Sequence, residues 1–250
     1  MSDWKTLHFF DSEKYNDEVV PKVKGFRVNY SDFFDSDLAK YVRRNTSILE
    51  LQSFIDGLTE DLKKHKVLDE IEKRTKKRNQ PYQEFVRQRL RDGEKFSKLY
   101  ESQYETYSSL ITFIVFKECA SFNPHFILGR RIFGSSIETI TGSIAEEVCS
   151  QITQMEVCIG ESYSTFTNWI TREEAELLLM DFSNVKPKNE DSFNYFKDFK
   201  VFLETAVDNS LGLIAGQNMH EGLITLIEKP LVEIELDINK LNLKYVIEYK

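Results

Sequence analysis

The chain has 250 residues, of which 41% are hydrophobic and 13% aromatic, and this apolar content excludes a globally disordered protein. Its formal net charge of −8 argues against nucleic acid as a partner of the whole chain, because phosphate binding needs clustered positive charge. The three cysteines are odd in number and have no CxxC spacing, so we expect reduced, buried thiols in a cytoplasmic protein.

The first predicted element is a short strand over residues 4–10. Leu7 and Phe9 fall on the same face of it, because side chains alternate along a strand. Asp11 or Ser12 then supplies the N-cap of a helix, since both side chains can accept hydrogen bonds from the first free amides.

The clearest helical pattern covers residues 47–62. Its apolar residues follow one another at spacings of 3, 4, 3 and 4, which is typical of one buried helical face. A strongly aromatic and apolar stretch over residues 100–116 predicts a central core helix, which we expect to stop at Asn123-Pro124.

Residues 135–153 predict another amphipathic helix, in which Gly142 and Ser143 would allow close packing against a neighbour. Thr171 and Glu174 have the spacing of a capping box and predict the start of the next helix. A further helix is predicted over residues 192–209, where phenylalanines recur every three residues.

The last forty residues change character. Residues 211–215 form a short apolar run, and apolar and acidic residues alternate over 232–238, the period of a half-exposed antiparallel strand. Residues 241–247 would be its hairpin partner. The predicted fold class is therefore α+β in a single domain. It has a mostly helical body over about 12–209 and a β-containing segment over about 211–250, with the N-terminal strand as a further candidate for the sheet.

One basic segment stands out against the acidic remainder. Residues 61–100 hold 13 Lys/Arg and 7 Asp/Glu, a local net charge of +6, whereas the other 210 residues have a net charge of −14. Two interpretations remain open: a face for an acidic partner, or solvated helices laced with i,i+4 ion pairs. The core of this basic belt comprises Lys63, Lys64, Lys66, Lys73, Arg74, Lys76, Lys77 and Arg78.

The segment 129–136 has the glycine spacing of a phosphate-binding loop, but serine stands where that loop needs lysine, which argues against nucleotide hydrolysis. A weaker hypothesis is an anion site in which Ser135 and Ser136 begin a helix and Arg130 and Arg131 lie just upstream. The alternative is that serine is an ordinary helix N-cap.

The remaining polar residues predict neither a catalytic nor a metal site. The four histidines have no partner at metal-ligand spacing, so we expect no metal and no cofactor. His220 and Glu221 resemble an acid–base pair, but a solvated turn with two polar residues is the favoured explanation.

Charge and the lack of a catalytic motif therefore lead to a non-enzymatic protein-binding protein. The leading hypothesis is a bacterial immunity or antitoxin-like protein that occludes a basic partner such as a toxin or nuclease. Two alternatives stay open: an enzyme whose site assembles only in three dimensions around His220, Glu221 and Arg130, or a self-associating structural protein. We expect no membrane partner, because the most apolar stretch is shorter than the roughly 20 residues that span a bilayer, and we expect no signal peptide.

Overall fold

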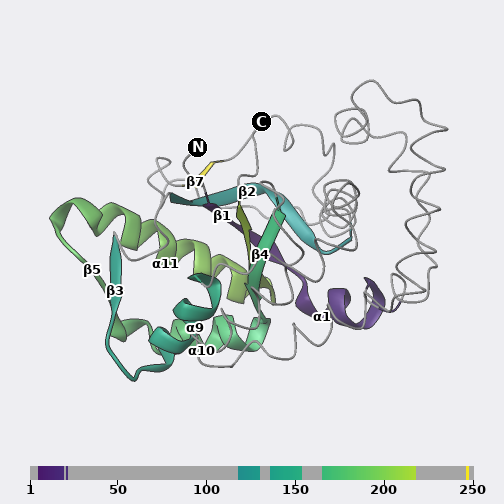
Figure 1. Ribbon diagram of the computed structural model, residues 1–250, viewed down its shortest axis with the longest axis horizontal. Helices are drawn as coiled ribbons and strands as arrows, with labels where there is room; N and C mark the ends of the chain where they lie inside the picture. The colour runs from purple at the N-terminus through teal and green to yellow at the C-terminus, as the bar shows by residue number, and fades with distance from the viewer. Residues whose placement is uncertain are drawn as a thin grey trace, which may run out of the picture.

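The computed structural model describes residues 5–19, 21, 118–129, 136–153, 165–217 and 246–247 (Figure 1). Within these ranges helices are combined with two antiparallel sheets, which is a mixed α+β architecture. The elements in chain order are β1 (Lys5–Phe10), α1 (Ser12–Lys14), the π-helical turn η1 (Tyr15–Val19), β2 (Ala120–Gly129), β3 (Ile137–Thr139), α9 (Ile144–Thr153), β4 (Thr165–Ile170), α10 (Arg172–Met180), η2 (Phe182–Asn184), β5 (Val185–Pro187), η3 (Glu190–Ser192), α11 (Phe193–Asp208), β6 (Gly212–Gln217) and β7 (Val246–Ile247).

Strand β1 is the central strand of the larger sheet, whose order is β4-β6-β1-β2-β7. It pairs with β6 along its whole length and with β2 through an interrupted register, antiparallel in both cases. The predicted N-terminal strand is therefore confirmed. It lies between β2, from the middle of the chain, and β6, from the C-terminal part. Strands β3 and β5 form a separate ribbon beside α11 (Figure 1).

The main hydrophobic core lies between one face of this sheet and helices α9, α10 and α11. Leu7 and Phe9 point into it, as the alternation of β1 predicts. Phe9 stacks on Phe202 of α11 with 4.2 Å between ring centroids, and Phe126 of β2 lies 5.7 Å from the same ring. Aromatic rings from three elements thus hold α11 against the sheet.

The opposite face of β1 is buried as well. Thr6, His8 and Phe10 are all at most 1% exposed. Phe10 meets Trp169 of β4 edge-on at 6.1 Å, and Tyr15 contacts both rings. A strand buried on both faces explains why β1 has no strict alternation of polar and apolar residues.

The predicted body over 12–209 is not clearly mostly helical in the described residues, because strands β2 to β5 all fall inside that range. Asn123-Pro124 does not end a helix and lies within β2. The pairing moves from His8–His125 to Phe9–Ser121, so residues 122–124 form an irregularity in the ladder. Proline has no amide to donate, and a bulge is where a sheet tolerates it.

The predicted helix over 135–153 is half correct. Its second half is α9, but residues 137–139 form β3, and Gly142 has a φ of +81°, which an α-helix cannot contain. Nothing lies near the position of a Cβ on Gly142, so its role is the turn itself and not close packing. Ser143 accepts a hydrogen bond from the amide of Glu146 and begins the helix.

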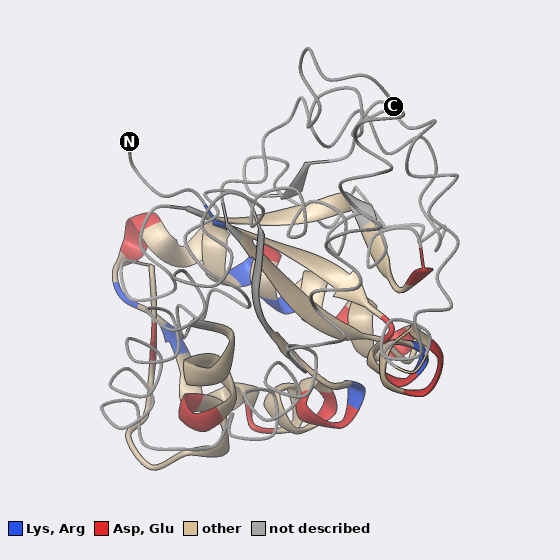
Figure 2. Ribbon diagram, turned by 45° about the vertical axis from the view of Figure 1, so that its right-hand side comes forward, with Lys and Arg blue, Asp and Glu red and all other residues tan. Residues whose placement is uncertain are grey.

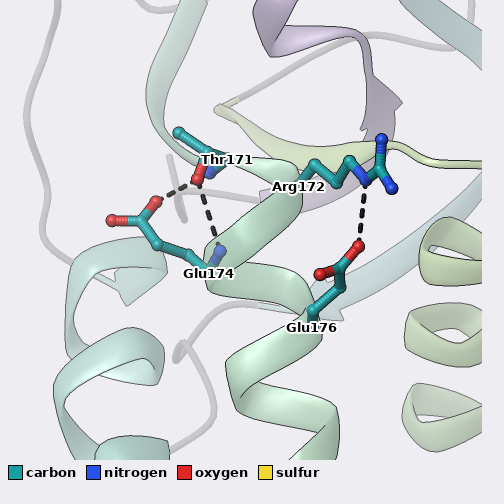
Figure 3. Close-up of polar contacts among 4 residues, drawn as sticks. All are labelled: Thr171, Arg172, Glu174 and Glu176. Carbon is teal, nitrogen blue, oxygen red and sulfur yellow. Dashed lines mark hydrogen bonds and ion pairs between the residues drawn. The ribbon is translucent and has the colours of Figure 1, made fainter.

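Helix α10 begins with the predicted capping box (Figure 3). The Thr171 hydroxyl accepts a hydrogen bond from the Glu174 amide at 3.3 Å, and the Glu174 carboxylate accepts one from the Thr171 amide at 2.7 Å. Arg172 donates to Glu176 one turn further on at 2.9 Å. Two amides at the start of the helix, those of Thr171 and Glu174, are thereby satisfied.

Replacing Thr171 with alanine is expected to lower the free energy of unfolding by about 1 kcal/mol, because the Glu174 amide loses its acceptor. The matched control is Thr205→Ala. The Thr205 hydroxyl donates only to the Val201 carbonyl inside α11, and its loss should have a smaller effect. Urea unfolding monitored by circular dichroism measures both variants. An effect of Thr171→Ala no larger than that of the control would contradict the capping role.

Helix α11 confirms the helix predicted over 192–209, but its phenylalanines do not form one stripe. Phe199 and Phe202 are fully buried, whereas Phe193 is 56% exposed. Three residues advance a helix by about 300°, so a spacing of three rotates around the axis by about 60° per step. The buried face also includes Tyr195 and Ala206.

At the C-terminus, the apolar run 211–215 leads into β6, and Val246–Ile247 form β7 against β2. These strands confirm that the C-terminal segment contributes to the sheet. The predicted helices over 47–62 and 100–116 and the predicted strand over 232–238 lie outside the described residues.

Candidate functional site

Negative charge dominates the described part of the chain. Its residues include 17 Asp/Glu and 7 Lys/Arg, a net charge of −10, whereas the rest of the chain, which contains the basic belt, has a net charge of +2. The acidic segments, red in Figure 2, recur at the ends of the helices.

Part of this acidity stabilises the helices themselves. The first turns of α9 and α10 and the turn η3 each contain two adjacent carboxylates, where the helix dipole favours negative charge. The Glu146 carboxylate accepts a hydrogen bond from the Gly142 amide at 2.7 Å. Each of the first turns of α9 and α10 also contains a carboxylate that is exposed to solvent, Glu147 in α9 and Glu173 in α10.

Glu173 remains anionic under ordinary conditions. A hydrogen bond from its own backbone amide, supported by one from the Thr171 hydroxyl and by the nearby Arg172, lowers the pKa of its carboxyl group. The outward side of α10 therefore carries a persistent negative charge near its first turn.

The segment that follows β1 adds more carboxylates near the same helix. Glu13, Asp17 and Glu18 are exposed on α1 and η1. Glu13 lies close enough to Arg172, the first residue of α10, to help raise the pKa of its guanidinium, after the larger effect of the Glu176 hydrogen bond.

The other end of α10 adjoins the start of α9. Asp181, the C-cap of α10, accepts a hydrogen bond from the Ala145 amide at 2.8 Å. Helix α10 therefore lies between α1 at its first turn and α9 at its last. We call five exposed carboxylates on α1, η1, α9 and α10 the acidic face; they are Glu13, Asp17, Glu18, Glu147 and Glu173.

Two histidines meet on the face of the larger sheet opposite the main core. His8 of β1 and His125 of β2 are register partners, with 5.6 Å and an angle of 34° between their rings. The Thr6 hydroxyl lies 2.8 Å from Nε2 of His8. Both rings are at most 2% exposed, so no solvent-borne substrate reaches them in this arrangement. Sequence spacing could not reveal the pair, because the two residues come from strands far apart in the chain.

Two cysteines are inert thiols. Cys119 and Cys149 are free and buried, and burial raises the pKa of each to about 12. For Cys119, Lys14 opposes this shift and nearby carboxylates add to it. The prediction of buried, reduced thiols is confirmed for these two, and Cys158 lies outside the described residues.

Most of the residues predicted as sites from the sequence lie outside the described ranges. Ser136 is described, and it lies in the turn before β3, where its carbonyl accepts a hydrogen bond from the Lys188 amide. It does not begin a helix, so the helix N-terminus expected there is absent. The residues outside the described ranges are Arg130, Arg131, Ser135, His220, Glu221 and, in the basic belt, Lys63, Lys64, Lys66, Lys73, Arg74, Lys76, Lys77 and Arg78.

In the part of the chain that the structure describes, no three His, Cys, Asp or Glu residues are grouped to hold a metal ion. Within the same ranges, no helix is both long enough and apolar enough to cross a membrane. The chain matches no protein-family model, no curated protein and no solved structure at a significant level.

Proposed function

We propose that this protein is a non-enzymatic binding protein that occludes a basic protein partner, in the manner of a bacterial immunity protein or antitoxin. The observation that supports the proposal most is the net charge of −10 on the described residues, with carboxylates of three helices set along α10. Such a surface attracts a basic protein over a distance of about one Debye length and speeds its association.

The acidic face is better suited to recognition than to catalysis. Its carboxylates come from separate elements and lie on a solvated surface, where charge mainly sets the association rate and the choice of partner. The one close pair of imidazole rings in the described residues is buried inside the sheet. The proposal includes a cytoplasmic location, which the free thiols of Cys119 and Cys149 support.

The test is a pulldown of tagged protein from its native lysate at about 50 mM and about 500 mM salt, followed by mass spectrometry. The expected result is one basic partner that is retained at low salt and whose retention is reduced at high salt. Its association rate with the purified protein should fall at least about tenfold between the two conditions. Retention of no basic protein, or binding that does not depend on salt, would overturn the proposal.

Charge-reversal variants then assign the binding to the acidic face. Replacing Glu13, Asp17 and Glu173 with lysine should slow association at low salt at least about tenfold. The matched control reverses three other exposed carboxylates, Glu190, Asp191 and Asp208, which lie at the two ends of the α11 region. Equal slowing by both variants would show that only the overall charge matters.

A further inference from the structure

Four large apolar side chains are exposed where α9 begins and α10 ends. Met180 is 84% exposed, and Ile140, Ile144 and Leu177 are between 43% and 47% exposed. Single exposed apolar residues are common on protein surfaces, but a group of them at one place marks an interaction site.

Hydrogen bonds hold these residues together. The Ile140 amide donates to the Asn184 carbonyl at 3.0 Å, and the Ala145 amide donates to the Asp181 carboxylate at 2.8 Å. The Asn184 side chain donates to the same carboxylate at 2.7 Å. The turn before α9 and the turn after α10 are therefore tied to each other, and the four apolar residues flank this junction. We call Ile140, Ile144, Leu177 and Met180 the apolar patch.

Helices α9 and α10, which hold three of the four patch residues, are predominantly acidic. Helix α9 contains two glutamates and no basic residue, and helix α10 contains three glutamates and one arginine. That arginine, Arg172, is paired with Glu176. Glu147 and Glu173 are exposed on the same two helices, so a segment that covers the patch meets carboxylates and benefits from carrying positive charge.

Most of the backbone amides of the turn before α9 already have acceptors. The amides of Ile140 and Ala145 donate within the protein, as do those of Gly142 to Glu146 and of Ser143 to the Ile140 carbonyl. What this junction offers to a partner is mainly side chains, which is how an amphipathic helix docks on a helical surface.

We infer that the apolar patch is the docking site for an amphipathic helix of the basic partner, with apolar side chains toward Leu177 and Met180 and lysines or arginines toward Glu147 and Glu173. This inference rests on the proposed function and names the part of the partner that α9 and α10 recognise. The apolar contacts supply the affinity, and the carboxylates select a cationic partner.

The first experiment uses labelled synthetic helices of about 14 residues, in which leucine recurs at helical spacing and the other face is all lysine or all glutamate. Fluorescence anisotropy should show saturable binding of the lysine peptide and none of the glutamate peptide. Replacing both Leu177 and Met180 with glutamine should lower the affinity for the lysine peptide at least about tenfold. The control Phe193→Gln removes a 56% exposed apolar side chain from α11 and should change the affinity less than about twofold.

Equal binding of both peptides, or equal effects of the two variants, would overturn the inference. So would a wild-type dimer in sedimentation analysis that the Leu177/Met180 variant converts to a monomer, because a second copy would then occupy the patch. The same variants, tested on the basic partner from the pulldown, separate this inference from the proposed function. If binding of the partner depends on salt but is unchanged by the Leu177/Met180 substitutions, the inference is overturned and the proposed function is not. If no basic partner is found, the proposed function is overturned.

Discussion

Replacing Phe202 with alanine is expected to lower the free energy of unfolding by about 3–5 kcal/mol. The ring is fully buried, stacks on Phe9 of the central strand at 4.2 Å and lies 5.7 Å from Phe126 of the neighbouring strand. Its removal eliminates the contacts of this ring with β1 and β2. It also leaves a cavity, because the rigid rings of Phe9 and Phe126 cannot move far enough to fill the space. This loss is a large part of the stability of an ordinary domain, which is about 5–15 kcal/mol.

Chemical unfolding in urea, followed by tryptophan fluorescence and circular dichroism, measures this effect. The control is Phe193→Ala in the same helix, where the ring is 56% exposed and the loss should be within about 0.5 kcal/mol. If the two alanine variants were equally stable, the packing of α11 on the sheet described above would be incorrect.

Replacing Gly212 with alanine should also destabilise the protein strongly, by about 2–4 kcal/mol. A Cβ at this position would run into the Ile170 carbonyl oxygen and would lie 2.9 Å from the carbonyl carbon of Thr171 and 3.2 Å from the Arg172 amide nitrogen. All three obstacles are backbone atoms, so no side chain can rotate away. The start of β6 or the capped start of α10 would have to move.

Gly142→Ala separates this clash from backbone strain. Gly142 has a positive φ but open space around it, so its replacement should cost about 1 kcal/mol. A loss for Gly212→Ala no larger than that for Gly142→Ala would contradict the close approach of β6 to the β4–α10 turn. A crystal structure of the Gly212 variant would show which of the two elements shifts.

The sequence was most informative where the deciding interactions are local. The capping box joins Thr171 to a residue three positions away, and both hydrogen bonds are present. The same holds for the Asp11 N-cap, whose side chain accepts a hydrogen bond from the Lys14 amide. These features depend on few neighbours, so residue type and spacing suffice to predict them.

The sequence misled where one period suits two structures. Ile137, Ile140 and Ile144 have helical spacing, but Ile137 is buried in β3 and the other two are exposed around a glycine turn. In β2 the Asn123-Pro124 pair resembles the end of a helix, and only the pairing with β1 shows it to be an irregularity within a strand. Tertiary pairing decides both cases, and local propensity does not contain it.

The candidate site shows the same division. Net negative charge was evident from composition, but its arrangement along α10 depends on the electrostatic influence of Glu13 on Arg172 and on the hydrogen bond between Ala145 and Asp181, residues that are distant in sequence. The apolar patch is not evident from the sequence, because the helical spacing of Ile140 and Ile144 predicts buried positions on one helical face. The contact of His8 with His125 likewise needs the register of β1 and β2.

The central place of β1 has a consequence for synthesis of the chain. One neighbour of β1, β6, begins at Gly212, about 200 residues after β1 ends. At about 5–20 residues per second, a ribosome needs about 10–40 s to make the intervening chain. During that time the edge of Lys5–Phe10 that will receive β6 has no native partner, and exposed strand edges recruit other chains. The β6-facing edge of β1 is therefore open to other chains until residues 212–217 have been synthesised.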